Sequence, residues 1–418
     1  MRTYEKYKDS GISWIGKVPE GWNKCRFKNF MTLITDASTS DNKIGLENIE
    51  SGTGKYVQTD SEFEGNGIAF KPHDIVYGKL RPYLQKVWCA EFEGNAVGDF
   101  FVFRNKCNST SSFLKYLLLS DNFTQFANGT TYGAKMPRVS SNAILDQEFY
   151  IPSLSEQEAI ANYLDKKTAE IDKIIAEREK KIELLNELKS SIISRAVTKG
   201  INPHAKMKDS GIDWIGEIPE GWEVRRLKYI GESGNGLTYS PNDTTKDSEK
   251  GILVLRSSNI QDNKLSLEDN VFVNEAPLKL MVRKGDIIIC SRNGSVSLIG
   301  KSILIEKDMN ATFGAFMLRF RSKYNSKYVY YLVSDTISKY KGLFATTTIN
   351  QLTKNAIASM SCAFAPENEQ TEIVDFIENE LRKIERTLQK VHSEIALLRE
   401  YKQSLISEVV TGKRKVID

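Results

Sequence analysis

Apolar residues return at alternating steps of four and three along two long stretches of the chain. The first stretch has ten such positions from Leu164 to Ala196, and the second has ten from Ile377 to Val409; seven and nine of them are apolar. No Pro or Gly interrupts either stretch, so this 3.5-residue period predicts two coiled-coil helices. The residues expected to pack helix on helix are Leu164, Ile171, Ile175, Ile182, Leu185, Ile192, Ile377, Leu381, Ile384, Leu388, Val391, Ile395, Leu398 and Leu405.

The two helical segments are copies of each other at an offset of 213 residues. Both open after a proline with polar or acidic residues and close near a Thr and a Gly, as helix termini do. We expect helices near 152–199 and 366–412, and a helix from 156 to 198 spans roughly 65 Å at ~1.5 Å per residue. Two equally long helices with matching seams are expected to pack on each other. Such a pair suits either a dimerisation stalk or a spacer that holds two globular domains at a fixed distance.

Short apolar runs separated by Gly, Asn and Asp turns fill the stretches 23–150 and 223–365. This pattern predicts mixed α/β domains with a curled sheet. The two stretches share little literal sequence but keep a common rhythm, in which the run beginning at Asp74 corresponds to the run beginning at Asp286. We therefore expect two related domains that differ in their loops.

A fifteen-residue phrase opens each half of the chain. "KDSGISWIGKVPEGW" occupies 8–22, "KDSGIDWIGEIPEGW" occupies 208–222, and twelve of the fifteen positions are identical. The offset of 200 is far longer than the period of a solenoid repeat, so the unit of duplication is a domain. "VPEG" and "IPEG" have Pro second and Gly fourth, which favours a type I turn, and the flanking tryptophans supply large rings for packing.

The order of these segments predicts the layout of the chain. The second opening phrase follows the end of the first helix, so the first phrase should lie near the end of the second helix, with the termini close together in a circular pseudo-twofold arrangement. The expected class is α/β (α+β), with two globular mixed domains separated by two long coiled-coil helices. The expected segments are 1–151, 152–200, 201–365 and 366–418.

Composition and charge describe a globular protein with an uneven charge distribution. Forty per cent of the residues are hydrophobic and 27 per cent are charged, and no apolar run approaches the ~20 residues of a membrane span. The polar N-terminus lacks a signal-peptide core, so we expect a cytoplasmic protein. Lys and Arg balance Asp and Glu at 14 to 14 in 23–150 but exceed them by 20 to 13 in 223–365. The second domain therefore suits a polyanionic partner.

Motifs for catalysis or metal binding do not assemble from the sequence. The five cysteines are scattered and the three histidines stand alone, so neither a disulfide framework nor a metal site is expected. "GSVSLIGKS" at 294–302 departs from a P-loop by one residue of spacing and lies between strand-like runs. The Gly-rich turns lack the spacing of a nucleotide or S-adenosylmethionine cradle, and no Asn-Pro-Pro-aromatic motif of an amino-methyltransferase occurs. We expect a chain without catalysis of its own.

Residues suited to DNA contact recur in corresponding loops of the two variable stretches. Arg, Lys, Asn and Gln can make bidentate contacts to base edges, and aromatic rings can stack on bases. The candidates are Lys79, Arg81, Tyr83, Lys135 and Arg138 in the first stretch, and Arg256, Ser257, Asn259, Arg292, Asn293, Thr347, Asn350, Gln351 and Lys354 in the second.

Together these features resemble the specificity (S) subunits of type I restriction-modification systems. The resemblance covers essentially the whole chain and rests on the paired "SGIxWIGxxPEGW" openings, the paired Glu-Gln helix starts after Pro152 and Pro366, and the alternation of variable and helical regions. Pro152 stands one residue further from its Glu-Gln than Pro366 does. The phrase is specific by itself; the other features are specific only in combination.

The resemblance implies a division of labour within a larger complex. The variable stretches would be target recognition domains that each read one half of an asymmetric bipartite site in double-stranded DNA. The helices would pack antiparallel, set the gap between half-sites and dock two methyltransferase (M) subunits, which bring S-adenosylmethionine. Restriction/translocase (R) subunits would bring ATP and Mg²⁺. The alternatives are a self-contained DNA methyltransferase or nuclease, and a structural coiled-coil adaptor.

Overall fold

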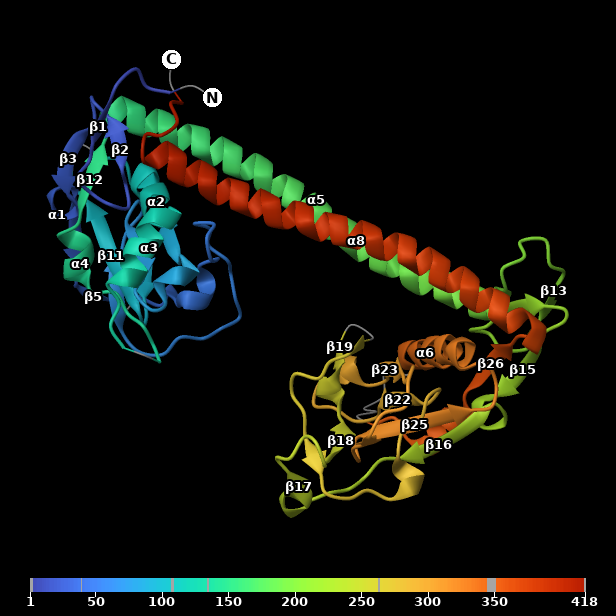
Figure 1. Ribbon diagram of the computed structural model, residues 1–418. Helices are drawn as coiled ribbons and strands as arrows, with labels where there is room; N and C mark the ends of the chain where they lie inside the picture. The colour runs from blue at the N-terminus through green and yellow to red at the C-terminus, as the bar shows by residue number, and fades with distance from the viewer. Residues whose placement is uncertain are drawn as a thin grey trace. The chain divides into compact units, whose positions relative to one another are not determined.

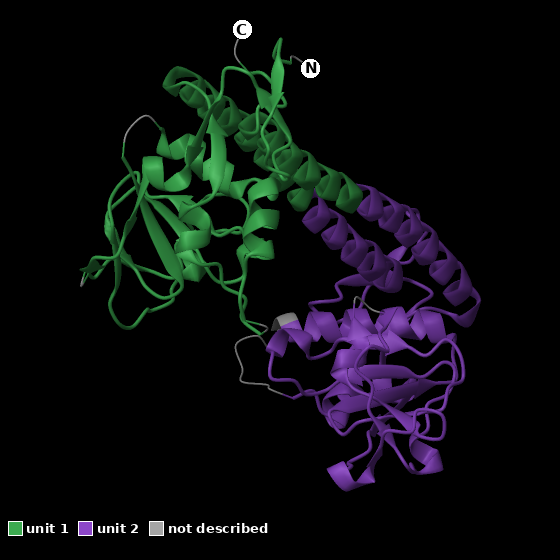
Figure 2. Cartoon of the chain, turned by 60° about the vertical axis from the view of Figure 1, so that its left-hand side comes forward, with its two compact units in different colours: residues 1–180, 391–418 green, residues 181–390 purple. Residues whose placement is uncertain are grey.

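The computed structural model describes residues 3–38, 40–106, 109–133, 135–261, 264–343 and 351–416. The chain forms two compact units, one made of residues 1–180 and 391–418 and the other of residues 181–390 (Figure 2). Each unit contains one mixed domain and a part of both long helices. The expected α/β class with two domains and long helices is confirmed.

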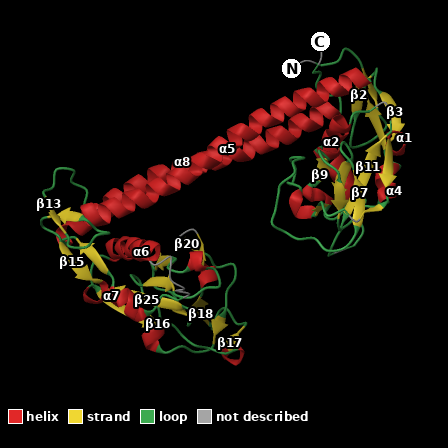
Figure 3. Ribbon diagram, turned by 180° about the vertical axis from the view of Figure 1, so that it is seen from behind, coloured by secondary structure: helices red, strands yellow, loops and turns green. Residues whose placement is uncertain are grey.

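The two long helices are α5 (Leu154–Lys199) and α8 (Glu367–Val410), which lie side by side in Figures 1 and 3. Every residue expected in helix packing is buried or half-buried. In the first unit Arg178 pairs with Glu394, and in the second Lys189 approaches Glu385 at 3.8 Å. In each unit, residues later along α5 pair with residues earlier along α8, so the two helices run antiparallel.

Lys402 is the charged residue in the seam of α8, and the fold provides it with a partner. Its side chain is buried, and its ammonium donates to Asp172 Oδ1 on α5 at 2.6 Å. The other oxygen of Asp172 accepts from Lys55, which lies in a loop of the first domain, also at 2.6 Å. This carboxylate therefore ties both helices and the domain together within the first unit.

Replacing Asp172 with Asn is expected to destabilise the first unit in a pH-dependent way. Burial raises the pKa of Asp172, but hydrogen bonds from Lys402 and Lys55 outweigh it and leave the pKa below the usual value. A lowered carboxyl pKa contributes stability above the unfolded pKa of about 3.9, and that stability is lost as pH falls through the folded pKa. Urea unfolding at pH 7 and below pH 4 should show a difference between wild type and Asp172→Asn that shrinks in acid.

Glu170→Gln is the matched control, because Glu170 lies on the same helix but forms an exposed ion pair with Lys167. Exposed ion pairs contribute little to stability, so this control should behave like the wild type at both pH values. An Asp172→Asn difference that stays constant with pH would contradict the assignment.

The first domain is built around two sheets of four strands. One sheet has the order β4-β11-β8-β9 and the other β5-β7-β10-β6. Helices α2 and α3 begin at Thr110 and Ser120, whose hydroxyls cap them. The bounds are β4 (Met31–Ile34), β5 (Ala37–Ser38), β6 (Lys43–Ile44), β7 (Gly67–Phe70), β8 (Ile75–Gly78), β9 (Val87–Cys89), β10 (Gly94–Ala96), β11 (Phe100–Asn105), α1 (Phe27–Phe30), α2 (Ser111–Leu119), α3 (Asp121–Gly129) and α4 (Ser141–Leu145).

The second domain repeats the plan, with sheets β16-β25-β22-β23 and β17-β21-β18-β24 and a small pair β19-β20. Its core is continuous with the helix ends, because Val197 of α5, Tyr328 of α6 and Ile373 of α8 belong to one buried cluster. The bounds are β16 (Gly231–Asn235), β17 (Thr244–Thr245), β18 (Ile252–Leu255), β19 (Ile260–Gln261), β20 (Lys264–Leu265), β21 (Phe272–Val273), β22 (Ile287–Cys290), β23 (Ser302–Leu304), β24 (Ala311–Phe313), β25 (Met317–Ser322), α6 (Ser326–Leu343) and α7 (Lys354–Ser359).

A buried aspartate occupies the corresponding position in the core of each domain. Asp74 accepts two hydrogen bonds from the Arg104 guanidinium and one from the backbone of Lys71. Asp286 accepts the same set from Arg321 and the backbone of Arg283. The correspondence inferred from the sequence rhythm therefore extends to side-chain contacts.

Each domain is attached to the helices by a pair of antiparallel strands, which we call its clasp. Strand β3 (Asn23–Arg26), which leads into the first domain, pairs antiparallel with β12 (Glu148–Ile151), which leads out of it. Strands β15 (Glu223–Arg226) and β26 (Ser361–Phe364) do the same in the second. The chain therefore enters and leaves each domain at one place.

The opening phrase joins each clasp to the start of a long helix. Each phrase folds into a small hairpin, β1 (Tyr7–Asp9) with β2 (Lys17–Pro19) and β13 (Met207–Asp209) with β14 (Glu217–Pro219). The indole of Trp22 donates to Glu156 of α5 at 3.3 Å, and that of Trp222 donates to Glu369 of α8 at 2.9 Å. The tryptophans therefore link the hairpins to the helices.

The position of the turn differs from the sequence prediction. Its closing hydrogen bond runs from the Trp22 N–H to the Pro19 carbonyl, so Pro19 is the first turn residue and not the second. The reason is that Pro19 still pairs with Tyr7 in the hairpin. The expected nearness of the first phrase to the end of α8 is confirmed within the first unit, where Gly412 lies against Pro19 and Trp22. Both termini belong to this unit (Figure 1).

Candidate nucleic-acid interface

The two candidate loops of the first domain meet after strand β8. Isolated bridges join Leu80 to Arg138 and Tyr132 to Arg138, and the Arg81 N–H donates to the Pro137 carbonyl at 2.8 Å. Arg81 adopts a left-handed conformation at φ 51°, which costs a non-glycine residue backbone free energy and is common at functional sites. The fold thus brings together residues from two segments that are fifty residues apart.

Exposed basic and aromatic side chains share this surface, which we call the β8 surface. It comprises the exposed side chains of Arg81, Tyr83, Tyr132, Lys135 and Met136. Tyr83 is 54% exposed and Tyr132 61%, although both rings are large and apolar. Aromatic rings beside basic side chains are the combination that stacks on bases and contacts phosphates.

An acidic residue restrains the other two candidates of the first domain. Arg138 donates two hydrogen bonds to Asp99, and the Lys79 ammonium lies 3.7 Å from the same carboxylate. The Arg138 hydrogen bond is the main cause that lowers the pKa of Asp99. Lys79 also lies over the ring of Phe101. Asp99 therefore neutralises part of the positive charge, in agreement with the balanced composition of this domain.

The corresponding surface of the second domain gathers most of its described candidates. Asn293 donates to the Ser257 hydroxyl at 3.0 Å, and Arg292 forms a bridge with Gln351. A cavity of about 390 Å³ beside them is lined by polar residues that include Gln351 and Lys354. Asn235, Thr238, Ser291, Thr353 and Asn355 also line this cavity. These amides, hydroxyls and ammonium groups suit recognition of base edges.

The residue that contacts the Arg292 side chain differs from the one that contacts the basic candidates of the first domain. Its guanidinium lies 5.5 Å from the ring centre of Phe316, which is 60% exposed. Phe316 directly precedes β25 as Asp99 directly precedes β11, so an aromatic residue replaces the carboxylate. The charge of Arg292 is therefore not neutralised from this position.

Two candidates of the second domain, Arg256 and Asn259, have other roles, and two more lie outside the described residues. Asn259 is fully buried, its amide accepts from the Arg256 N–H and donates to Ser266, and we correct its assignment from DNA contact to shaping of the loop. The Arg256 side chain pairs with Asp269 at 2.8 Å. Asn48 shapes the matching loop of the first domain, where it accepts from the Gly45 N–H. Thr347 and Asn350 lie outside the described residues.

Several residues of these surfaces were not predicted from the sequence, among them Asp99, Phe101, Tyr132, Met136 and Phe316. Phe101 and Phe316 belong to strand-like runs, where an aromatic residue is ordinarily interpreted as core. The available signal was the equivalence of Phe316, just before β25, with Asp99, just before β11. It becomes visible only when the two runs are aligned on Arg104 and Arg321.

Comparison with known proteins identifies the protein family. A family model described as type I restriction modification DNA specificity domain matches residues 19–184 and 219–393. The chain belongs to this family. The two matched ranges each contain one of the mixed domains described above and part of a long helix, so the chain carries two copies of the DNA specificity domain.

Curated relatives within this family are specificity subunits. The chain is 25% identical over 96% of both lengths to the putative type I restriction enzyme MjaX specificity subunit of Methanocaldococcus jannaschii. It is 27% identical to the MjaVIII specificity subunit of the same organism over 65% of this chain and 64% of that protein. It is 24% identical to the EcoBI specificity subunit of Escherichia coli over 82% of this chain and 74% of that protein.

Solved structures share the fold. A chain from a structure described as the structural basis of complex assembly and conformational transition of the type I R-M system superimposes with a TM-score of 0.71. It covers 94% of this chain and 98% of its own length at 16% identity. The HsdS subunit from Thermoanaerobacter tengcongensis matches with a TM-score of 0.50 at 16% identity, over 95% of this chain and 98% of its own. Within the described ranges, no helix is long and apolar enough to cross a membrane.

Proposed function

We propose that this chain is the DNA sequence-specificity subunit of a type I restriction-modification complex and that it has no catalytic activity of its own. The observation that carries the proposal is the pair of corresponding surfaces after β8 and β22, built from different side chains on the same scaffold. Because the side chains differ, each domain would recognise a different half of a bipartite DNA site. The target would then be asymmetric.

The long helices would set the spacing between half-sites and bind the partner subunits. Support comes from apolar side chains that the helix pair leaves exposed at repeated positions. Leu184 and Leu188 are exposed on α5, and Leu397 and Tyr401, which stand 213 residues later, are exposed on α8. Exposed apolar groups at matching positions suit two copies of one partner. We infer two methyltransferase subunits there, which supply S-adenosylmethionine, and restriction/translocase subunits, which supply ATP and Mg²⁺.

Domain exchange tests the proposal directly. Residues 23–150 would be replaced with the corresponding domain of another family member, and adenine methylation would be mapped across the genome of cells that express the complete system. We expect one half of the methylated bipartite motif to change while the other half and the gap between them stay the same.

The matched control exchanges residues 223–365 in the same way and should change the opposite half. A methylation pattern that is untouched by either exchange, while the complex is expressed, would favour the coiled-coil adaptor. Methylation or cleavage by the purified chain alone would favour the self-contained enzyme.

A further inference from the structure

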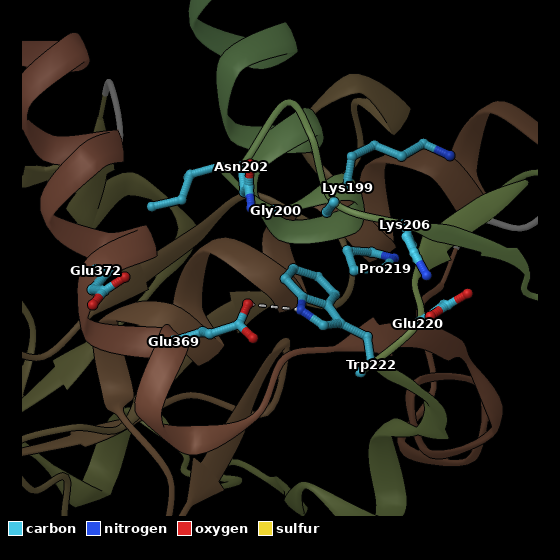
Figure 4. A pocket seen from close by; sticks show the side chains of 12 residues that line it. Lys199, Gly200, Asn202, Lys206, Pro219, Glu220, Trp222, Glu369 and Glu372 are labelled. Carbon is cyan, nitrogen blue, oxygen red and sulfur yellow. Dashed lines mark hydrogen bonds between the residues drawn. The ribbon is translucent and has the colours of Figure 1, made fainter.

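A cavity of about 370 Å³ lies beside Trp222 at the junction of the second unit, where α5 ends and α8 begins (Figure 4). Its lining combines the ring of Trp222 and Pro219 with the carboxylates of Glu369 and Glu372 and the backbone around Gly200. The segment from Ile201 to Lys206 forms its outer wall and is largely exposed. The cavity is therefore accessible from outside and has both an aromatic face and a hydrogen-bond acceptor.

The corresponding place in the first unit is filled by a side chain of the same protein. Tyr4 donates its hydroxyl hydrogen to Glu156 Oε1 at 2.5 Å, and its ring meets Trp22 edge-on at 6.2 Å between ring centres. The same carboxylate oxygen accepts the Trp22 indole N–H. Burial, followed by the Glu156 hydrogen bond, raises the pKa of the Tyr4 hydroxyl well above its usual value. A tyrosine, a tryptophan and a glutamate thus form a closed cluster.

The second unit contains the tryptophan and the glutamate of this cluster but not the tyrosine. The position that corresponds to Tyr4 at the offset of 200 is His204, which is exposed. The His204 N–H donates to the Asn202 side chain in a turn that also contains Pro203. The chain is continuous here, because residues 200–206 connect α5 to β13. This connection directs the backbone into a turn.

The open cluster presents the groups that bind Tyr4 in the closed one. Glu369 Oε2 accepts the Trp222 indole, and no hydrogen bond reaches Oε1 from the residues that the structure describes. Figure 4 shows this carboxylate facing the Trp222 ring. A cavity of about 150 Å³ suffices for benzene, so the volume here accommodates a phenol ring. The nearby Lys199 ammonium is already bound to the carbonyls of Ile215 and Glu217 and does not compete for Glu369.

We propose that this cavity is a binding site for a tyrosine side chain of a partner protein, held by an edge-on contact with the Trp222 ring and by a hydrogen bond from its hydroxyl to Glu369. Among the residues that the structure describes the site occurs once, because Tyr4 occupies the equivalent place in the first unit. A partner that uses it distinguishes the two ends of an otherwise repeated molecule. The proposal concerns contact with protein and does not depend on how the domains recognise DNA.

Binding of N-acetyl-tyrosinamide to the full-length chain tests the site. The five tryptophans give five indole N–H signals in ¹⁵N NMR spectra, and a Trp222→Phe variant assigns the relevant one. We expect the Trp222 signal to shift saturably while the Trp22 signal stays in place. N-acetyl-phenylalaninamide should bind at least about tenfold more weakly, because it cannot donate a hydrogen bond to the carboxylate.

Two variants separate binding from folding. His204→Tyr places a tyrosine in the exposed turn, outside the lining of the cavity, and should leave binding of the added amide unchanged. Glu369→Ala should weaken binding at least about tenfold, with the unchanged Trp22 signal reporting an intact fold elsewhere. The proposal is overturned if no saturable shift occurs, if both amides bind equally, or if Glu369→Ala leaves binding unchanged.

Discussion

Replacing Arg292 with Ala is expected to weaken DNA binding by the assembled complex about ten- to hundredfold. The guanidinium lies over an exposed phenylalanine with no carboxylate at that position, beside a polar cavity. A bidentate contact to a base contributes about 1 to 3 kcal/mol, and ten- to hundredfold corresponds to about 1.4 to 2.8 kcal/mol within that interval. The measurement is a titration of the specific DNA duplex by fluorescence anisotropy, repeated across salt concentrations.

The salt dependence tells which kind of contact Arg292 makes. Loss of a phosphate contact would lower the slope of log K against log salt by about 0.9, whereas loss of a base contact would leave the slope nearly unchanged. Arg283→Ala is the control, because Arg283 is exposed at the opposite end of strand β22. Equal losses in the two variants would mean that only overall charge matters, which would contradict a localised interface.

Replacing Asp286 with Ala is expected to lower the free energy of unfolding of the second unit by about 3 kcal/mol. Asp286 is 1% exposed, and its removal leaves Arg321 and the backbone N–H of Arg283 without their acceptor. Breaking a buried ion pair by removing one partner costs about 3 to 5 kcal/mol, and Arg321 is partly exposed, which favours the lower end. Hydrogen exchange of the β22 and β25 amides measures the effect within this unit.

Asp269→Ala provides the comparison for Asp286, because Asp269 also pairs with an arginine but is 70% exposed. Its loss should change the free energy by no more than about 1 kcal/mol. If both substitutions had the same small effect, the buried pair would not be a structural anchor of the domain.

The elements that the sequence predicted well are those defined by local periodicity. The seam from Ile377 to Val409 is apolar at nine of its ten positions, so both the helix and its buried face follow from the sequence. The corresponding runs around Asp74 and Asp286 were also found, because a short apolar run after an acidic residue is a local signal. The turn at Pro19 begins one residue later than the sequence predicted, because its position depends on the pairing of Pro19 with Tyr7.

The electrostatics of the interface could not be predicted, because they depend on contacts between distant residues. Lys79 and Arg138 were correctly recognised as basic loop residues, but their shared contact with Asp99 arises only when two loops and the start of β11 meet. Asn259 looked like a base-contacting amide and is instead enclosed in its own loop. Local composition identifies groups able to contact DNA but does not reveal which of them the fold already uses.

The clasps that attach the domains have a consequence for how this protein can evolve. Because β3 pairs with β12 and β15 with β26, insertions or deletions inside a domain leave its two attachment points adjacent. Between its two clasp strands the second domain is thirteen residues longer than the first, as the offsets of 200 and 213 require, and its clasp closes in the same way. New loops can therefore accumulate, and whole domains can be replaced by recombination, without remodelling the helices. Loop sequences can therefore diversify while the helix pair stays unchanged.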